Sequence, residues 1–325
     1  VFYTLNTFVH FSFLNTAASP AGIAVIHSLF NIGATILLFP FANLLEKMAI
    51  LAIPDKGSEV EEMEEEKINP DLARLDERFL DKPGFAMEEC RGVAINMARK
   101  SKKAMNLAID LLKEYDEKTS ARVEKLENQI DQYEDALGTY LVKLSERDLS
   151  VKDSRILSVL LHCIGDFERI SDHAVNIRDA AVEMNKKNLQ FSDKAKKELL
   201  VFSNAIRDII DRAVLAFETG DTGLAKEVEP LEQVIDELNK AIKKRHIKRL
   251  RKGKCSIELG LVLADIVTNY ERVSDHCSNI AVCLIQEQDK EVEEHDLTAH
   301  MDEEDNRKFA EQIKEYTEKY ALPEK

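Results

Sequence analysis

Two distant stretches of the chain have nearly the same sequence. "DFERISDHAVNI" runs from Asp166 to Ile177, and "NYERVSDHCSNI" runs from Asn269 to Ile280, at an offset of 103 residues. Upstream of each, "LENQID" at 126–131 and "LEQVID" at 231–236 also match, at an offset of 105. Two separate segments that repeat at nearly one offset indicate an internal duplication. The fold must therefore accommodate two copies of one structural unit.

Each copy has the apolar period of α-helices. The apolar positions of 123–144 share one arc at 100° per residue: Val123, Leu126, Ile130, Tyr133, Leu137, Tyr140, Leu141 and Leu144. In 228–242 the same arrangement falls on Val228, Leu231, Ile235, Leu238 and Ile242. We expect helices at about 85–114, 118–146 and 151–187 in the first copy, and 193–219, 221–251 and 255–288 in the second. Short connections join antiparallel neighbours, so we expect an all-α fold with a three-helix bundle in 84–190 and another in 191–290.

The first 45 residues contain no Asp, Glu, Lys or Arg. Residues 22–45 are long enough to cross about 30 Å of hydrocarbon as a helix, and 2–14 are also apolar. We therefore expect one or more membrane helical segments in 1–53, within a chain that is the C-terminal part of a longer protein. A signal peptide fits poorly because no basic region precedes the run; a buried core helix is the other alternative. His27 and Asn31 are candidates for a transport path, or for neutral hydrogen bonds between helices.

Outside these regions the sequence is strongly charged. Residues 54–83 contain the acidic run "EVEEMEEE" and are expected to be a linker. Residues 291–325 are expected to hold a charged tail helix at about 302–320 that packs back on the domain. The basic stretch "KKRHIKRLRKGK" at 243–254 ends a predicted helix, where cations favour the helix dipole. It could equally contact anionic lipid or an acidic partner.

The overall charge and the cysteines limit the function classes. A net charge of −15 argues against nucleic acid as a partner. The five cysteines form no C-x-x-C pair, which is typical of reduced thiols and favours a cytoplasmic location for the helical domain.

Each copy carries two Glu-x-x-x-Asp pairs. Residues four apart share one helix face, and an antiparallel bundle can bring two such faces together. Hard cations such as Fe, Mg or Mn prefer oxygen ligands, so the pairs are candidate metal ligands; a solvated acidic surface is the alternative. The candidates are Glu127, Asp131, Glu168 and Asp172 in the first copy, and Glu232, Asp236, Glu271 and Asp275 in the second.

The repeated motif holds further polar residues beside these acids: Arg169, His173 and Asn176, and Arg272, His276 and Asn279. We consider them as partners of the metal ligands, with a structural role for the two histidines as the alternative. The arginines lie about 100° from the acids around the helix, so they are not expected to pair with them.

The motifs "ERISDHAVNI" and "ERVSDHCSNI", with "LENQID" and "LEQVID" upstream, resemble the PhoU family of phosphate-uptake regulators. The resemblance implies two three-helix bundles that bind metal through the eight acids above. The apolar start, with "AVIHSLFNIGATILLFPF", resembles the last membrane segment of bacterial sodium/phosphate cotransporters, some of which carry a PhoU-like tail. The Gln-Ser-Ser motifs of that family are absent from this sequence.

The function expected from this resemblance is the C-terminal part of a sodium-dependent inorganic phosphate symporter in the inner membrane, with a cytoplasmic PhoU-like regulatory domain. Phosphate, the coupling ion sodium and the lipid bilayer are the expected partners, with a regulatory protein or a second copy of the chain as a further one. One alternative is a membrane-tethered PhoU-like metal-binding adaptor that regulates phosphate signalling or uptake. A di-iron carboxylate enzyme is disfavoured, because His173 follows Glu168 by five positions and not by three, so the chain is not expected to be an enzyme.

Overall fold

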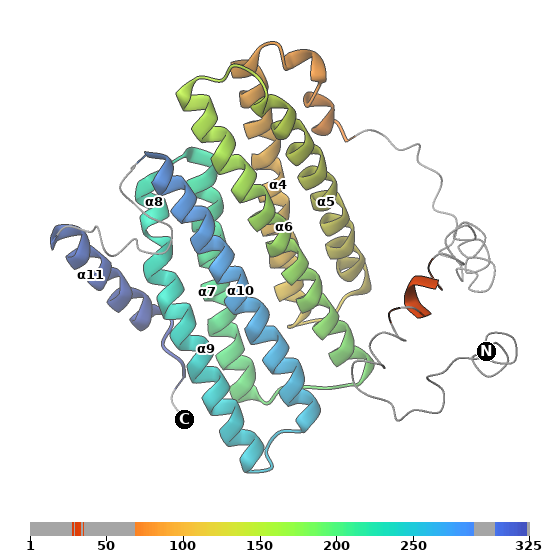
Figure 1. Cartoon of the computed structure of the whole chain (residues 1–325). Helices are drawn as coiled ribbons and strands as arrows, with labels where there is room; N and C mark the ends of the chain where they lie inside the picture. The colour runs from red at the N-terminus through yellow and green to blue at the C-terminus, as the bar shows by residue number, and fades with distance from the viewer. Residues whose placement is uncertain (1–27, 29, 34, 36–68, 289–302, 324–325) are drawn as a thin grey trace, which may run out of the picture. The chain divides into compact units, whose positions relative to one another are not determined.

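The computed structural model describes residues 28, 30–33, 35, 69–288 and 303–323. The chain divides into two compact units, residues 1–67 and 68–325. In the first unit the described residues are helical and exposed. The second unit carries the duplicated sequence, and the regular secondary structure in its described parts is all helical (Figure 1).

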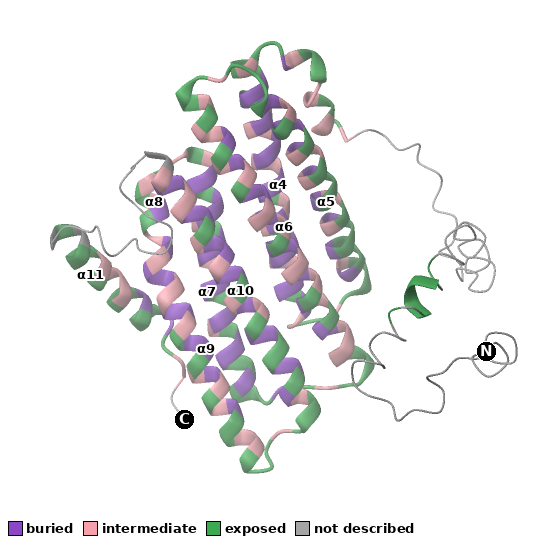
Figure 2. Cartoon of the chain, viewed as in Figure 1, coloured by how far each residue is buried: buried purple, intermediate pink, exposed green. Residues whose placement is uncertain are grey.

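The first copy forms three long helices, α4 (Pro83–Leu111), α5 (Glu117–Ser145) and α6 (Val151–Lys186), which pack against one another. Side chains that accept backbone hydrogen bonds mark where α5 and α6 begin. Asp116 caps α5 by accepting a hydrogen bond from the backbone N–H of Thr119, and Ser150 caps α6 by accepting one from Asp153. All eight apolar positions predicted to share one arc of α5 are buried (Figure 2). The predicted helices and their buried face are therefore confirmed in this copy.

The second copy consists of α7 (Asp193–Thr219), α8 (Thr222–Lys226), α9 (Val228–Arg251) and α10 (Ile257–Gln288). The single helix predicted for 221–251 is wrong, because the chain breaks between α8 and α9 at Glu227. Pro230 lacks an N–H and its ring conflicts with the carbonyl four residues earlier, so one helix cannot continue through this point. Helices α7, α9 and α10 pack as the second bundle.

Residues 69–82 are packed on the first bundle, although the sequence places them in a linker. They contain two 3₁₀ turns, η3 (Leu72–Arg74) and η4 (Glu77–Phe79). The hydroxyl groups of two buried tyrosines of α5 bond this segment: Tyr133 donates to Asp71, and Tyr140 donates to the carbonyl of Asp76 at 2.9 Å. In the sequence the two tyrosines belong to the apolar arc, and in the structure their hydroxyl groups hold residues 69–82 in place.

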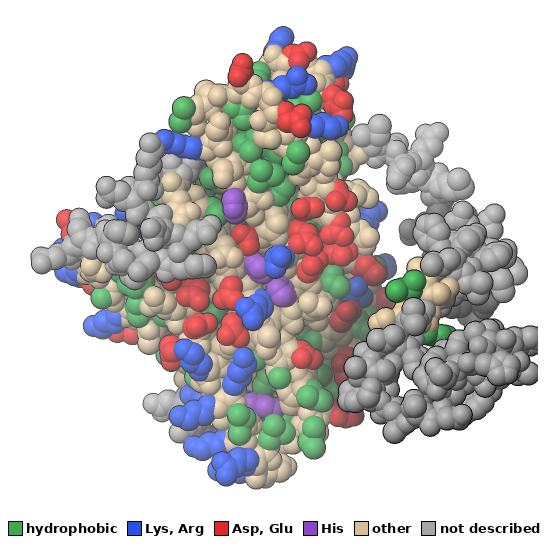
Figure 3. Space-filling view, in the orientation of Figure 1, with side chains coloured by type: hydrophobic (Ala, Val, Ile, Leu, Met, Phe, Trp, Pro, Cys, Tyr) green, Lys and Arg blue, Asp and Glu red, His purple; other side chains and the backbone are tan. Residues whose placement is uncertain are grey.

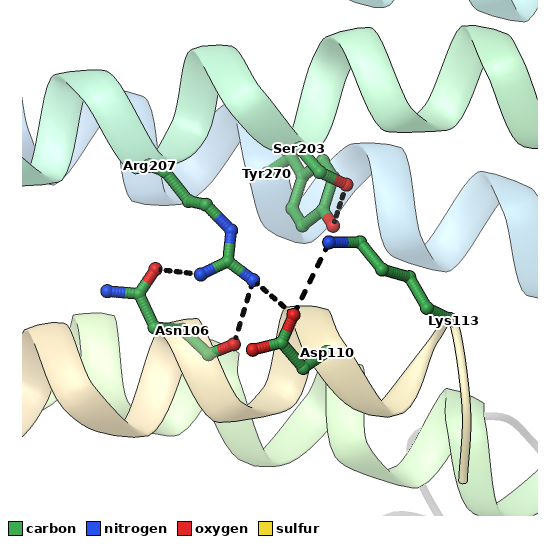
Figure 4. A network of polar contacts seen from close by, with 6 residues as sticks. All are labelled: Asn106, Asp110, Lys113, Ser203, Arg207 and Tyr270. Carbon is green, nitrogen blue, oxygen red and sulfur yellow. Dashed lines mark hydrogen bonds and ion pairs between the residues drawn. The ribbon is translucent and has the colours of Figure 1, made fainter.

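Helices α6 and α10, the last of each copy, form the main contact between the bundles, and α4 and α7 form a second contact. Figure 4 shows the polar part of the α4–α7 contact. Arg207 of α7 donates to the side chain of Asn106 at 2.6 Å and to Asp110 at 2.8 Å, both on α4. Close by, Ser203 and Tyr270 share a buried hydrogen bond of 2.8 Å that joins α7 to α10.

The tail helix α11 (Glu303–Lys319) packs against α9, as expected from the sequence. Tyr316 and Tyr320 are buried, and the Tyr320 hydroxyl donates to Asp208 of α7 at 2.7 Å. The C-terminal segment therefore covers part of the second bundle.

None of the helices in the described part of the chain has the length and apolarity that a bilayer span requires. The segments expected to lie in the membrane, at 2–14 and 22–45, fall almost wholly outside the described residues, and so does His27. Asn31 is described, and its side chain is exposed.

The α10 helix offers a matched test of its buried face. Leu263 is 3% exposed, whereas Leu261, two residues earlier, is 63% exposed. We predict that Leu263→Ala lowers the free energy of unfolding by about 2–5 kcal/mol through lost burial and a new cavity. Leu261→Ala should change it by about 0.5 kcal/mol or less. Urea unfolding of both variants checks this, and equal losses would show that the burial of α10 is wrongly assigned.

Candidate metal centre

The four candidate acids of the first copy come together between α5 and α6. Glu127 and Asp131 lie one turn apart on α5 and face Asp172 on α6; one carboxylate oxygen from each lies within 4.8 Å of the others. Glu168, one turn before Asp172, hydrogen-bonds to it. The acids are part-buried or exposed at the surface of the bundle. The spacing that predicts one acidic face on each helix thus brings the two faces together.

Burial and the charges of neighbouring acids raise the pKa values of Glu127, Asp131 and Glu168. Burial, together with the negative charge of Asp172, raises the pKa of Glu168 to about 7. Burial and neighbouring acids also raise the pKa of Glu127 and of Asp131. A hydrogen bond between two carboxyl groups requires that one of them keeps a proton. The raised pKa of Glu168 therefore favours its protonated form near neutral pH.

The second-copy acids are also neighbours, but they are already partly paired. Burial, together with the charges of Glu229, Asp236 and Asp275, raises the pKa of Glu232 to about 8. Lys243 donates to Glu271 at 3.3 Å, and Arg272 donates to Asp275 at 3.2 Å. In the parts of the chain that the structure describes, no three acids of this copy meet the spacing found in the first.

The pairing of Arg272 with Asp275 corrects the expectation that neither motif arginine contacts the acids. A side chain as long as arginine reaches three residues along its own helix despite the angle between the two positions. The equivalent Arg169 is exposed and makes no ion pair with another described residue.

Lys243, which pairs with Glu271, has no counterpart in the first copy. At the offset of 105 residues that aligns Glu127 with Glu232, Lys243 corresponds to Gly138 and Lys240 to Asp135. The second copy therefore carries two cations on α9 where the first has a glycine and a further acid. The first copy has no built-in cation at these positions.

The motif histidines and asparagines join the two bundles. The Nδ1–H of His173 on α6 donates to Asn269 on α10 at 2.8 Å, and the Nδ1–H of His276 on α10 donates to Asp166 on α6 at 2.8 Å. The two imidazole rings stack with their centroids 5.5 Å apart. Burial lowers the pKa of His173, which favours the neutral ring.

The asparagines reinforce these contacts. Asn176 donates to Asn269 at 3.2 Å, and Asn279 donates to Asp166 at 3.4 Å. Asp166 and Asn269 are equivalent positions at the offset of 103 residues, so each copy gives the other the same set of bonds. The expectation that these four residues assist the metal ligands is not what the hydrogen bonds show; the structural role left open for the histidines fits them.

Several residues of the site carry no assignment from the sequence. Besides Lys243, they are Asp166 and Asn269, and two partners of further acids: Arg178 lies 3.6 Å from Glu124, and Ser278 donates to Glu229 at 2.6 Å. Both copies of the motif begin with Asp or Asn, and this repetition is the sequence signal that points to Asp166 and Asn269.

Seen from one side, acidic side chains gather in two patches, one over α5 and α6 and the other over α9 and α10 (Figure 3). Histidine side chains lie between them. The junction thus presents the acids of both copies on one face of the domain.

Comparison with known proteins agrees with this duplicated architecture. The model of the PhoU domain matches the chain twice, at residues 94–181 and 199–284. A phosphate-specific transport system accessory protein PhoU homolog from Thermotoga maritima is 28% identical over 178 residues, which cover 54% of this chain and 76% of that protein. A phosphate-specific transport system accessory protein PhoU homolog from Pseudomonas putida is 26% identical over 200 residues, which cover 61% of this chain and 77% of that protein.

Solved structures share the fold. PhoU from Pseudomonas aeruginosa superposes with a TM-score of 0.59 at 23% identity, covering 62% of this chain and 96% of that one. The phosphate transport system regulatory protein PhoU from Streptococcus pneumoniae also gives a TM-score of 0.59, at 19% identity, and covers 65% of this chain and 99% of its own. The two matched segments together span more than half of the sequence and coincide with the two helical bundles, so the chain belongs to the PhoU domain family.

Proposed function

We propose that this chain regulates phosphate transport, and that its first acidic cluster binds a hard metal ion as part of that task. The observation that carries the proposal is the convergence of Glu127, Asp131 and Asp172 from two helices, with one carboxylate oxygen of each within 4.8 Å of the others. The accessory role in phosphate transport is taken from the names of the relatives.

The residues present fit such an ion. All four side chains of the first cluster offer carboxylate oxygens, the ligand type that Fe³⁺, Mg²⁺ and Mn²⁺ prefer. Bound there, the ion would supply positive charge that offsets the repulsion between the acids. Glu127 and Asp131 would hold it from α5, and Glu168 and Asp172 from α6, so the two helices would be tied together at this point. A regulator needs two states that differ in structure, here with and without the bound ion. A ligand shifts the equilibrium between two states only when it binds one of them better.

The second cluster is expected to bind more weakly. Lys243 and Arg272 already compensate Glu271 and Asp275, and a metal ion would have to displace them. Once Lys243 is removed, the four carboxylates of the second cluster would serve as ligands: Glu232, Asp236, Glu271 and Asp275.

We predict that Asp131→Asn with Asp172→Asn weakens Mn²⁺ binding by roughly a hundredfold or more, because two ligand charges are lost. The control Glu146→Gln with Asp148→Asn removes two exposed acids at the end of α5 and should bind as the unchanged chain does. Lys243→Gln should strengthen binding at the second cluster. Titration calorimetry measures all three, and unchanged binding in the first variant would remove the ligand assignment.

The metal-free protein should lose stability as pH rises. Glu168 and Glu232 titrate at about 7 and about 8 in the folded chain, against a reference value of 4.5. Between pH 4.5 and the raised pKa of each group, the folded state keeps a proton that the unfolded state has lost. The contribution of the two glutamates to stability is therefore present below pH 4.5 and is lost as pH rises through about 7 to about 8.

Urea unfolding in the presence of a chelator measures the free energy of unfolding across this pH range. This free energy should fall less steeply with pH for Glu168→Gln with Glu232→Gln than for the unchanged chain. A slope that does not differ from that of the unchanged chain would contradict the assigned pKa shifts. Glu146→Gln serves as the control.

Uptake of labelled phosphate tests the function itself. A host strain that lacks the gene is complemented with the unchanged chain, with Asp131→Asn/Asp172→Asn, or with Glu146→Gln/Asp148→Asn, and grown in phosphate-rich and phosphate-poor medium. We expect the first and third to restore the difference in uptake between the media and the second to fail. Uptake that is independent of the gene would overturn the proposal.

A second candidate function is supported by the uncharged sequence of residues 1–45. In this reading the chain is the C-terminal part of a sodium-coupled phosphate symporter in the inner membrane, its helical domain lies in the cytoplasm, and His27 and Asn31 line the path. A PhoU-like adaptor tethered by the same segment is the rival. Sodium-dependent phosphate uptake by cells that express the full reading frame favours the symporter, and uptake without sodium dependence favours the adaptor.

A further inference from the structure

A basic cavity lies at the far end of the second bundle, where α7 begins and α9 ends. Its volume is about 680 Å³, within the usual range for small-molecule sites. Seven of its eleven lining residues are lysine or arginine: Lys194, Lys197, Arg245, Lys248, Arg249, Lys252 and Lys254. The other residues of the wall include Asp193, Glu198 and Pro323 of the C-terminal segment. Such a density of positive charge is unusual in a chain whose net charge is −15.

The acids of the cavity do not balance these cations. Glu198 is 4% exposed, and both of its oxygens are taken, one by Arg245 at 3.1 Å and one by Arg249 at 2.7 Å. Arg245 also donates to the carbonyl of Pro323 at 2.8 Å. The two arginines are thereby fixed in the wall, and the Nη2 atom of Arg249 is buried without an acceptor among the described residues.

The five lysines are exposed, and none of them forms an ion pair with another described residue. They come from both walls, Lys194 and Lys197 from α7 and the rest from the end of α9 and the turn after it. The N-terminus of α7 adds the positive end of a helix dipole, which Asp193 offsets in part.

The cavity is separate from the acidic clusters. The sequence of α9 changes from Glu and Asp in its first half to Lys and Arg in its second. Figure 3 shows Lys and Arg side chains gathered over the lower end of α9, away from the two acidic patches. A ligand bound here would therefore not compete with a cation at the clusters.

We propose that this cavity binds a small anion that carries two or more phosphate groups. Phosphate concentrates charge on a compact group that lysine ammonium and arginine guanidinium both bind well. A single phosphate would leave most of the five exposed lysines without a partner, whereas a polyphosphate reaches both walls. The phosphate groups can belong to a free polyphosphate or to the headgroup of a lipid, and the two sources are distinguished by experiment.

The test uses the full chain and its variant Lys248→Gln/Lys252→Gln/Lys254→Gln. The matched control is Lys103→Gln/Lys125→Gln/Lys186→Gln, which removes three exposed lysines from the other bundle. Titration calorimetry with tripolyphosphate, and with inorganic phosphate for comparison, measures the free anion. Co-sedimentation with phosphatidylcholine vesicles, with and without cardiolipin, measures the lipid headgroup.

We expect tripolyphosphate or cardiolipin to bind more tightly than inorganic phosphate or phosphatidylcholine, with an affinity that falls as salt rises. The cavity variant should weaken this binding by about tenfold or more, and the control variant should leave it unchanged. Circular dichroism confirms that both variants fold. No binding of either probe, or an equal loss in the two variants, would overturn the proposal.

Discussion

The antiparallel packing of α6 on α10 is the contact on which the rest of the domain depends. Each helix buries polar groups at this junction, and each supplies the partners that the other requires. His173 bonds to Asn269, His276 bonds to Asp166, and the rings stack between these bonds. Polar groups buried without partners would destabilise the domain, so the two copies have to meet in this register. The junction thereby fixes where the first helices of both copies can pack.

The register also explains why the repeated motif keeps Asp and His next to each other. Adjacent residues on a helix point about 100° apart. Asp172 therefore faces α5 and the acidic cluster, while His173 faces α10 and the other copy. The same holds for Asp275 and His276 in the second copy. One short motif thus builds half of an acidic cluster and half of the junction.

The two copies have diverged within this shared frame. Lys243 stands where the first copy has Gly138, and it compensates an acid of its own cluster. Asp166 stands where the second copy has Asn269, so one histidine faces a carboxylate and the other an amide. The duplication preserves the backbone arrangement, and substitutions at single positions decide which acids are paired with a cation of the chain.

Helix positions and buried faces could be predicted because they follow from local periodicity and capping. The buried arc of α5 and the bounds of α6 are of this kind. Contacts between distant segments could not, since periodicity does not tell which partner a polar side chain finds. The packing of residues 69–82 on Tyr133 and Tyr140 is one example. The histidines are another, because a ring beside an acid in sequence can serve the acid or point away from it.

The motif histidines hold the two bundles together, and a double-mutant cycle on His173 and Asn269 measures their contribution. Urea unfolding of His173→Ala, Asn269→Ala and the combined variant gives the coupling energy. Because the two side chains share a hydrogen bond, we expect a coupling of about 0.5–3 kcal/mol. Additive losses, within about 0.5 kcal/mol, would show that the two residues act independently and that the crossed bonds do not hold the bundles.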